Sequence, residues 1–232
     1  MGEMLAALIG DIFNWASWQG GNLAGLALKE LLDARLSRSR AILFDELAFG
    51  AITPGEAASD ESIAIVYRYL RSAQEGAARL NLRLLAAVFA GQVRDRAIAA
   101  DEFLYFADML ASLRRDEVIL LGTLLRTSNA YTDETPTPAS GRSADSSVRL
   151  AATTVARSEL VPKVFEDDAT FDAIANSLQR TGLVLATTIS MLSAGNEVQY
   201  SPTKLLRRLN ALAEIEGVLA RDSEFQTTKA RD

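Results

Sequence analysis

Carboxylates are the side chains of this sequence with the clearest chemical potential, because five Asp-Glu dipeptides occur in it. Paired carboxylates act as general acid and base, or bind Mg²⁺ or Mn²⁺ through oxygen. Adjacent residues on a helix, however, point about 100° apart, so one dipeptide makes no catalytic pair. Three of the five stand where a helix is expected to begin, and acidic side chains there stabilise the helix dipole. We interpret them mainly as helix starts, with a carboxylate metal site as the alternative. The dipeptides are Asp45-Glu46, Asp60-Glu61, Asp101-Glu102, Asp116-Glu117 and Asp133-Glu134.

The chain contains no His and no Cys. It therefore lacks the commonest general base, the commonest metal ligand and every thiolate nucleophile. Ser201 and Lys204 match a Ser-x-x-Lys nucleophile motif, but its companion motifs are absent and Ser201 is expected to cap a helix. No glycine pattern indicates a nucleotide loop. The sequence thus predicts no catalytic, cofactor-binding or metal-binding residue and favours a protein that is not an enzyme.

Composition and charge narrow the classes of partner. The chain has 232 residues and a net charge of -6, which disfavours a general nucleic-acid surface. Its longest uncharged run, residues 12–28, is too polar for a bilayer span, and no positively charged leader precedes it. We expect a cytoplasmic protein without a transmembrane segment. The 24 basic residues include only four Lys, a preference for Arg that suggests a GC-rich bacterial coding sequence.

The elements that position these groups are helices. From Ser59 to Val93 the apolar residues keep one helical period, which predicts one continuous amphipathic helix. Its opposite, solvent side carries a ladder of Arg and Glu that ends at Arg83. Gln74 and Asn81 interrupt the apolar side, one heptad apart. An amide there must find partners or cost about 1–3 kcal/mol. We expect both amides to be buried and hydrogen-bonded, at a specified packing contact or a binding surface.

Two further features of the first 50 residues are candidates for interaction. Trp15 and Trp18 lie in an amphipathic stretch before Gly20-Gly21, but the absence of nearby Lys or Arg favours core or subunit packing over a membrane surface. A second helix is expected over residues 22–49. It carries three Arg within six residues, which we interpret as a solvated face rather than a phosphate grip: Arg35, Arg38 and Arg40.

Residues 127–147 are dominated by Thr, Ser, Pro, Asp and Gly, and they predict a flexible linker. The chain is accordingly expected to comprise a helical bundle over 1–126, the linker over 127–147, and a smaller unit over 148–232. The predicted fold is mainly α: a multi-helix N-terminal bundle followed by a small winged-helix-like α+β unit with one β-hairpin.

The sequence pattern of the C-terminal unit predicts two helices, a β-hairpin and a third helix, in that order. A stretch rich in Val, Thr and Ile, interrupted by Gly195-Asn196, predicts the hairpin, and a helix is expected from Thr203 to about Arg221. In winged-helix proteins the helix before the hairpin can read DNA. Here that helix would present exposed polar side chains, and a basic cluster would follow the hairpin. The candidate residues are Asn176, Gln179 and Arg180 on the helix, and Lys204, Arg207 and Arg208 after the hairpin.

The leading hypothesis is a non-enzymatic protein-protein interaction or adaptor protein, self-associating as an oligomer, whose first helices and Gln74-Asn81 surface contact the partner. The first alternative is a DNA-binding regulator that uses the winged-helix-like unit, although Glu166, Asp167 and Asp168 oppose phosphate binding. The second alternative is a metal-dependent hydrolase built from carboxylates alone.

Overall fold

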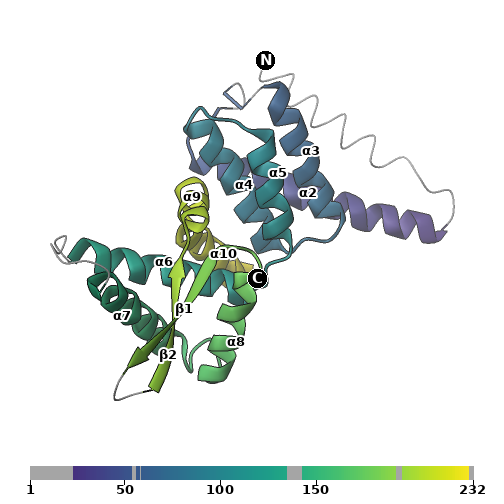
Figure 1. The fold of residues 1–232 in the computed structure, drawn as a ribbon. Coiled ribbons are helices and arrows are strands. Elements are labelled where there is room, and N and C mark those ends of the chain that lie inside the picture. The colour runs from purple at the N-terminus through teal and green to yellow at the C-terminus, as the bar shows by residue number, and fades with distance from the viewer. Residues whose placement is uncertain (1–22, 54–55, 58, 135–142, 192–194, 230–232) are drawn as a thin grey trace. The chain divides into compact units, whose positions relative to one another are not determined.

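The computed structural model describes residues 23–53, 56–57, 59–134, 143–191 and 195–229. Within these residues it contains nine α-helices and one pair of antiparallel strands (Figure 1). The prediction of a mainly helical chain with one hairpin near its C-terminus is confirmed. The chain divides into two compact units. Unit 1 comprises Met1–Leu113 and Ala211–Asp232, and unit 2 comprises Arg114–Asn210.

Unit 1 is built around one helix that is buried from Leu80 to Val93. This helix, α4, packs against α2, α3, α5 and α10, and α3 also packs against α2 and α5 (Figure 1). The bounds are α2 Leu23–Phe49, α3 Asp60–Gln74, α4 Arg79–Arg94, α5 Ala100–Ala111 and α10 Ile215–Lys229. Because α10 comes from the far end of the chain, unit 1 is assembled from both ends of the sequence.

The interpretation of three Asp-Glu dipeptides as helix starts is confirmed, because they lie in the first turns of α3, α5 and the first helix of unit 2. At α3 the cap is Ser59, whose Oγ accepts a hydrogen bond from the backbone N–H of Ser62 at 3.2 Å. The side chain thus pairs one of the N–H groups that the first helical turn leaves without a partner.

The expectation of one continuous helix from Ser59 to Val93 is wrong. The chain turns at Gly76, whose φ of 94° is a left-handed value that glycine adopts without strain. The N–H of Gly76 donates to the carbonyl of Ala73, and that of Ala77 donates to the carbonyl of Ser72. These two bonds form a Schellman motif, which ends α3 and lets α4 begin with a different helical phase.

Unit 2 consists of three helices, a hairpin and the first turns of a fourth helix. Strand β2 packs against α6 and α7, and β1 packs against α8 (Figure 1). The hairpin register pairs Val184 with Pro202 at one end and Met191 with Gly195 at the other. The bounds are α6 Arg115–Glu134, α7 Ser143–Leu160, α8 Asp168–Gln179, β1 Val184–Met191, β2 Gly195–Pro202 and α9 Lys204–Ala213.

An aromatic cluster forms the core of unit 2. Phe171 on α8 packs edge-on against Phe165 and Tyr200, with ring centroids 5.8 and 6.0 Å away. The guanidinium of Arg157 lies 4.5 Å above the Phe171 ring. The hydroxyl of Thr153 on α7 donates to the carbonyl of Tyr200 and accepts from its N–H, both at 3.0 Å. The cluster therefore fastens strand β2 between α7 and α8.

The predicted linker over 127–147 is helical at both ends, since α6 extends to Glu134 and α7 begins at Ser143. Residues 135–142 lie outside the described part of the chain. Thr127 is buried, and its hydroxyl donates to the carbonyl of Thr123 one turn earlier at 3.0 Å. A polar sequence thus continues the helix because its hydroxyls hydrogen-bond to the helix itself.

Two local predictions near the C-terminus are also corrected. Gly195 and Asn196 pair within the hairpin ladder instead of forming its turn. The expected helix from Thr203 to Arg221 is interrupted at Glu214, whose φ is 50°, so that α9 ends and α10 begins there. The cap of α9 is Thr203, whose Oγ1 accepts from the N–H of Leu206 at 3.2 Å, whereas Ser201 belongs to β2.

None of the described helices combines the length and apolarity that a membrane crossing requires.

Candidate functional site

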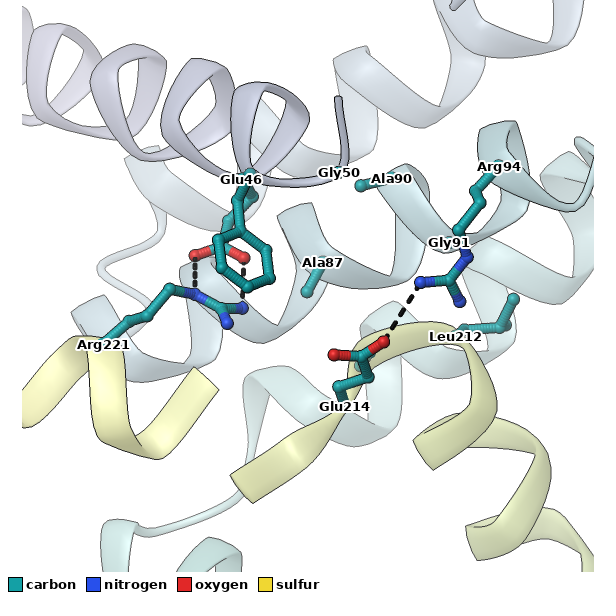
Figure 2. Close-up of a pocket in the computed structure, with 11 residues that line it drawn as sticks. Glu46, Gly50, Ala87, Ala90, Gly91, Arg94, Leu212, Glu214 and Arg221 are labelled. Atoms are coloured by element: carbon teal, nitrogen blue, oxygen red, sulfur yellow. Dashed lines mark hydrogen bonds and ion pairs between the residues drawn. The ribbon is translucent and has the colours of Figure 1, made fainter. Parts of the chain in front are cut away.

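A buried carboxylate, Glu46 on α2, is the centre of the ionic network in unit 1. Its exposed fraction is 2%. Arg83 on α4 donates from Nη1 to Oε1 at 2.8 Å. Arg221 on α10 binds both oxygens, from Nε to Oε1 at 3.2 Å and from Nη2 to Oε2 at 2.6 Å (Figure 2). One carboxylate therefore joins three helices that come from three distant parts of the sequence.

The geometry of this Arg83–Glu46–Arg221 cluster indicates a structural fastening. The guanidinium of Arg221 also lies 3.9 Å from the centroid of the Phe49 ring. Both carboxylate oxygens of Glu46 accept hydrogen bonds from guanidinium groups, which are the strong, charge-assisted kind. Removing one member of a buried ion pair typically costs about 3–5 kcal/mol, since the partner charge stays buried without compensation.

A small cavity of about 220 Å³ adjoins the cluster where the segment Ala211–Glu214 meets α4. Arg94 reaches across it and donates to Oε1 of Glu214 at 3.2 Å (Figure 2). It also donates to the carbonyl of Ala211 at 2.8 Å. Beside it Gly91 touches the backbone of Leu212 so closely that a Cβ on Gly91 would lie 2.3 Å from the Leu212 carbonyl oxygen. The cavity therefore lies at a docking contact between α4 and the returning C-terminal segment.

A larger cavity of about 520 Å³ lies between α2 and the turn from α3 to α4. Four arginines and one acidic residue, Asp45, are among its lining residues, and the rest of the wall is apolar or small. Two of the arginines, Arg35 and Arg38, belong to the group that the sequence places on a solvated face. The third of that group, Arg40, lies over the Phe44 ring at 5.5 Å. All three arginines are exposed, as the sequence predicted. The four lining arginines are Arg35, Arg38, Arg79 and Arg83.

A third feature of unit 1 is a set of large exposed side chains on α3 and α5. Ile63, Tyr67 and Tyr105 have exposed fractions of 41%, 50% and 54%. Ile63 and Tyr67 are four residues apart and share one side of α3. The two helices are joined by Arg68 and Asp108, whose Nη2 and Oδ1 atoms lie 2.7 Å apart.

Arg71 on α3 lies near both Tyr67 and the α5 residue Asp108. A hydrogen bond from Nε to Glu75 at 2.8 Å raises the pKa of Arg71, and the charges of Tyr67 and Asp108 raise it further. Asp108 lies one turn beyond Tyr105. We call Ile63, Tyr67, Arg71, Tyr105 and Asp108 together the α3–α5 face.

The two amide side chains that the sequence predicts to be buried, Gln74 and Asn81, lie in different environments. Asn81 is 2% exposed, and its Nδ2 lies 2.8, 3.2 and 2.8 Å from the carbonyl oxygens of Leu110, Ala111 and Leu113. The side chain therefore caps the C-terminal end of α5, where a helix leaves carbonyls without partners. The prediction of a buried, hydrogen-bonded amide is confirmed for Asn81. It is wrong for Gln74, which is only half-buried at the last position of α3.

The predicted polar side chains of α8 are exposed, and each has a partner within unit 2. Oδ1 of Asn176 accepts from Nε2 of Gln179 at 2.8 Å and from the hydroxyl of Tyr200 at 3.3 Å. Nη2 of Arg180 lies 3.4 Å from Oε1 of Glu117. These bonds tie the polar side of α8 to β2 and α6.

In the predicted basic cluster after the hairpin, Arg207 already has two hydrogen-bond partners on α6. Arg207 donates to Oδ1 of Asn129 at 2.8 Å and to Oγ of Ser128 at 3.0 Å. Lys204 is exposed, and Arg208 is half-buried. Trp15 and Trp18 lie outside the described residues.

Glu117 connects α6 with α8. Burial raises its pKa, but hydrogen bonds from the N–H of Arg114 at 2.8 Å and the hydroxyl of Ser177 at 2.7 Å, together with the charge of Arg180, outweigh burial and lower the pKa. The bond to Arg114 is the reciprocal half of a capping box, made by the glutamate at the third helical position. The described residues include no group of three or more Asp and Glu placed to hold a metal ion.

Comparison of the chain with protein-family models, curated proteins and solved structures finds no match in any of the three. The assignment of function therefore depends on the geometry of the chain itself.

The sequence reasoning missed Glu46, Arg83, Gly91 and Arg221. A signal existed for Glu46, because it lies three residues after Leu43 and directly before Leu47 on the apolar stripe of α2. The burial of Arg83 was not predicted because one continuous helix from Ser59 to Val93 places the Arg83 side chain on the solvent side.

Proposed function

We propose that this protein is a non-enzymatic interaction protein that self-associates through the α3–α5 face. The observation that carries the proposal is the exposure of Ile63, Tyr67 and Tyr105 on two packed helices. The buried side of α3 runs through Ile65, Val66, Tyr69, Leu70 and Ala73. The sequence provides a wider apolar arc than the core of unit 1 uses.

The composition of the face supports a second copy of this chain as the partner. Tyrosine and arginine are enriched at the centres of protein interfaces. The face also carries both signs of charge, in Arg71 and Asp108. A two-fold interface brings the same patch from both copies together, so a patch with both signs is complementary to itself. A stable interface needs about 800 Å² from each partner, and the contact must therefore extend beyond these five residues.

The proposal is tested with a double variant, Tyr67→Lys with Tyr105→Ser, studied by light scattering and sedimentation equilibrium. Both residues are exposed, so the fold is expected to persist. Loss of one interface tyrosine costs about 2 kcal/mol when it is a hot spot, and a two-fold dimer loses each contact twice. The dissociation constant should rise at least about 100-fold. Leu185→Ser, which removes a comparably exposed apolar side chain in unit 2, is the matched control and should leave association unchanged.

Two results would refute the self-association proposal: a wild-type chain that stays monomeric at about 100 µM, or a double variant that associates as strongly as the Leu185→Ser control.

Unit 2 is proposed to be a winged-helix-like unit used for protein contact. The order of three helices followed by a hairpin supports this proposal, as does the acidic approach to α8 at Glu166, Asp167 and Asp168. DNA binding is the alternative, favoured by the exposure of Asn176, Gln179 and Arg180. A gel-shift series with a genomic DNA pool at low salt decides between the two proposals. Retardation of the DNA that is weakened by Arg180→Ala supports DNA binding. Absence of any retardation excludes it.

A further inference from the structure

We propose that the cavity between α2 and the α3–α4 turn is a binding site for a small molecule that carries a phosphate group. The site is distinct from the α3–α5 face and does not depend on self-association. Its four arginines come from two helices: Arg35 and Arg38 from α2, and Arg79 and Arg83 from α4. Arginine presents its N–H groups in a planar fork that matches phosphate oxygens in pairs.

The charges around the cavity leave an excess of positive charge for a ligand. Arg83 is compensated by Glu46 at 2.8 Å, and Arg79 lies 3.3 Å from Asp222. Arg35 and Arg38 have no ion pair with any acidic side chain in the part of the chain that the structure describes. Among the described residues that line the cavity, the one acidic residue is Asp45, which lies 4.0 Å from Nη2 of Arg83 and does not offset both α2 arginines.

Arg83 is the most buried of the four arginines, with an exposed fraction of 6%. Its ion pair with Glu46 fixes the guanidinium beside the cavity.

Size and lining also suit a small organic phosphate. The volume of about 520 Å³ lies within the range of ligand pockets, about 300–1,000 Å³. The lining also includes the apolar residues Ile42 on α2 and Leu82 on α4, which can cover the uncharged part of such a molecule.

The test is calorimetric titration and thermal unfolding of the full chain with three probes: inorganic pyrophosphate, adenosine monophosphate, and vesicles that contain phosphatidic acid. Saturable binding of a soluble probe with a raised melting temperature supports a soluble phosphate ligand. Binding to the vesicles alone supports a lipid headgroup as the source of the phosphate. The double variant Arg35→Ala with Arg38→Ala should weaken the observed binding by at least about tenfold.

The control is Arg40→Ala, which removes one charge from the same helix at a position that does not line the cavity. It should keep wild-type affinity, since Arg40 lies over Phe44. Equal loss of binding in the control and the double variant would mean unspecific charge attraction and would overturn the proposal. Absence of saturable binding by all three probes would overturn it as well. Neither result bears on self-association, which is measured without ligand.

Discussion

Replacing Gly91 with alanine should separate the C-terminal segment from α4. A Cβ at this position would lie 2.3 Å from the carbonyl oxygen of Leu212, 2.6 Å from its Cα and 2.7 Å from its carbonyl carbon. Non-bonded carbon atoms are at their best separation at about 3.5–4.0 Å. The contacted atoms belong to the backbone, so no rotation of a side chain relieves the overlap, and the segment must move by about 1 Å.

The magnitude follows from two opposing effects. Alanine is the better helix former by about 1 kcal/mol in a helix interior. Overpacking of a close contact costs about 1–3 kcal/mol and sometimes more, and a shift of Leu212 also stretches the 2.8 Å bond from Arg94 to Ala211. Further along the segment, the bonds between Arg221 and Glu46 are shorter than 3.3 Å and tolerate little displacement. We expect a net loss of about 2 kcal/mol in the free energy of unfolding.

Urea denaturation and amide hydrogen exchange measure the effect. The free energy of unfolding of Gly91→Ala should fall, and the amides of α10 should exchange faster than those of α3. Gly217→Ala is the graded comparison, because a Cβ there would lie 3.1 Å from Nη1 of Arg221, a side-chain atom that need yield by only a few tenths of an ångström, and its loss of stability should be smaller than that of Gly91→Ala. A Gly91→Ala protein as stable as the wild type, with unchanged exchange in α10, would show that the close approach does not exist.

The remaining predictions concern polar groups inside each unit. Asn81→Ala removes the donor that caps α5 and should lower the free energy of unfolding by about 2 kcal/mol, whereas Gln74→Ala should change it by less than about 0.5 kcal/mol; equal effects in urea denaturation would contradict the cap. Glu117 has a pKa below its ordinary value of 4.5 in the folded chain, so its stabilisation is fully present above that value and is lost as the pH falls through the lower folded pKa. Glu117→Gln should flatten the acid side of the stability curve below about pH 4.5, and an unchanged slope would speak against the proposed hydrogen bonds of Glu117.

Local sequence rules predicted those parts of the fold that local physics determines. The acidic first turns of three helices and the length of α2 follow from capping and periodicity alone. The burial of Asn81 follows from its place on an apolar arc, although its acceptors lie about thirty residues away on α5. A pattern can require a partner for an amide without identifying the partner.

The errors arise where a single backbone residue changes the helical phase. Gly76 and Glu214 each adopt a left-handed conformation that ends one helix and starts another. Beyond Gly76 the helical period of α3 no longer predicts which side of the chain faces the solvent. Arg83, which that period assigns to the solvent side, is in fact buried against Glu46. An L-residue such as Glu214 gives little warning of such a break, because glutamate seldom has a positive φ.

Long-range assembly accounts for the rest of what the sequence did not reveal. Glu46 and Arg221 are 175 residues apart, yet they form the closest buried ion contact described in unit 1. Glu46 and Arg83 are both buried, and Arg221 on α10 binds Glu46. The C-terminal segment therefore completes an ionic network whose other two members belong to the first half of the chain. Desolvated charges of this kind are stable only when every member is present. Unit 1 is therefore expected to fold cooperatively from both chain ends, and the α3–α5 face and the arginine-lined cavity should both depend on the docking contact between Gly91 and Leu212.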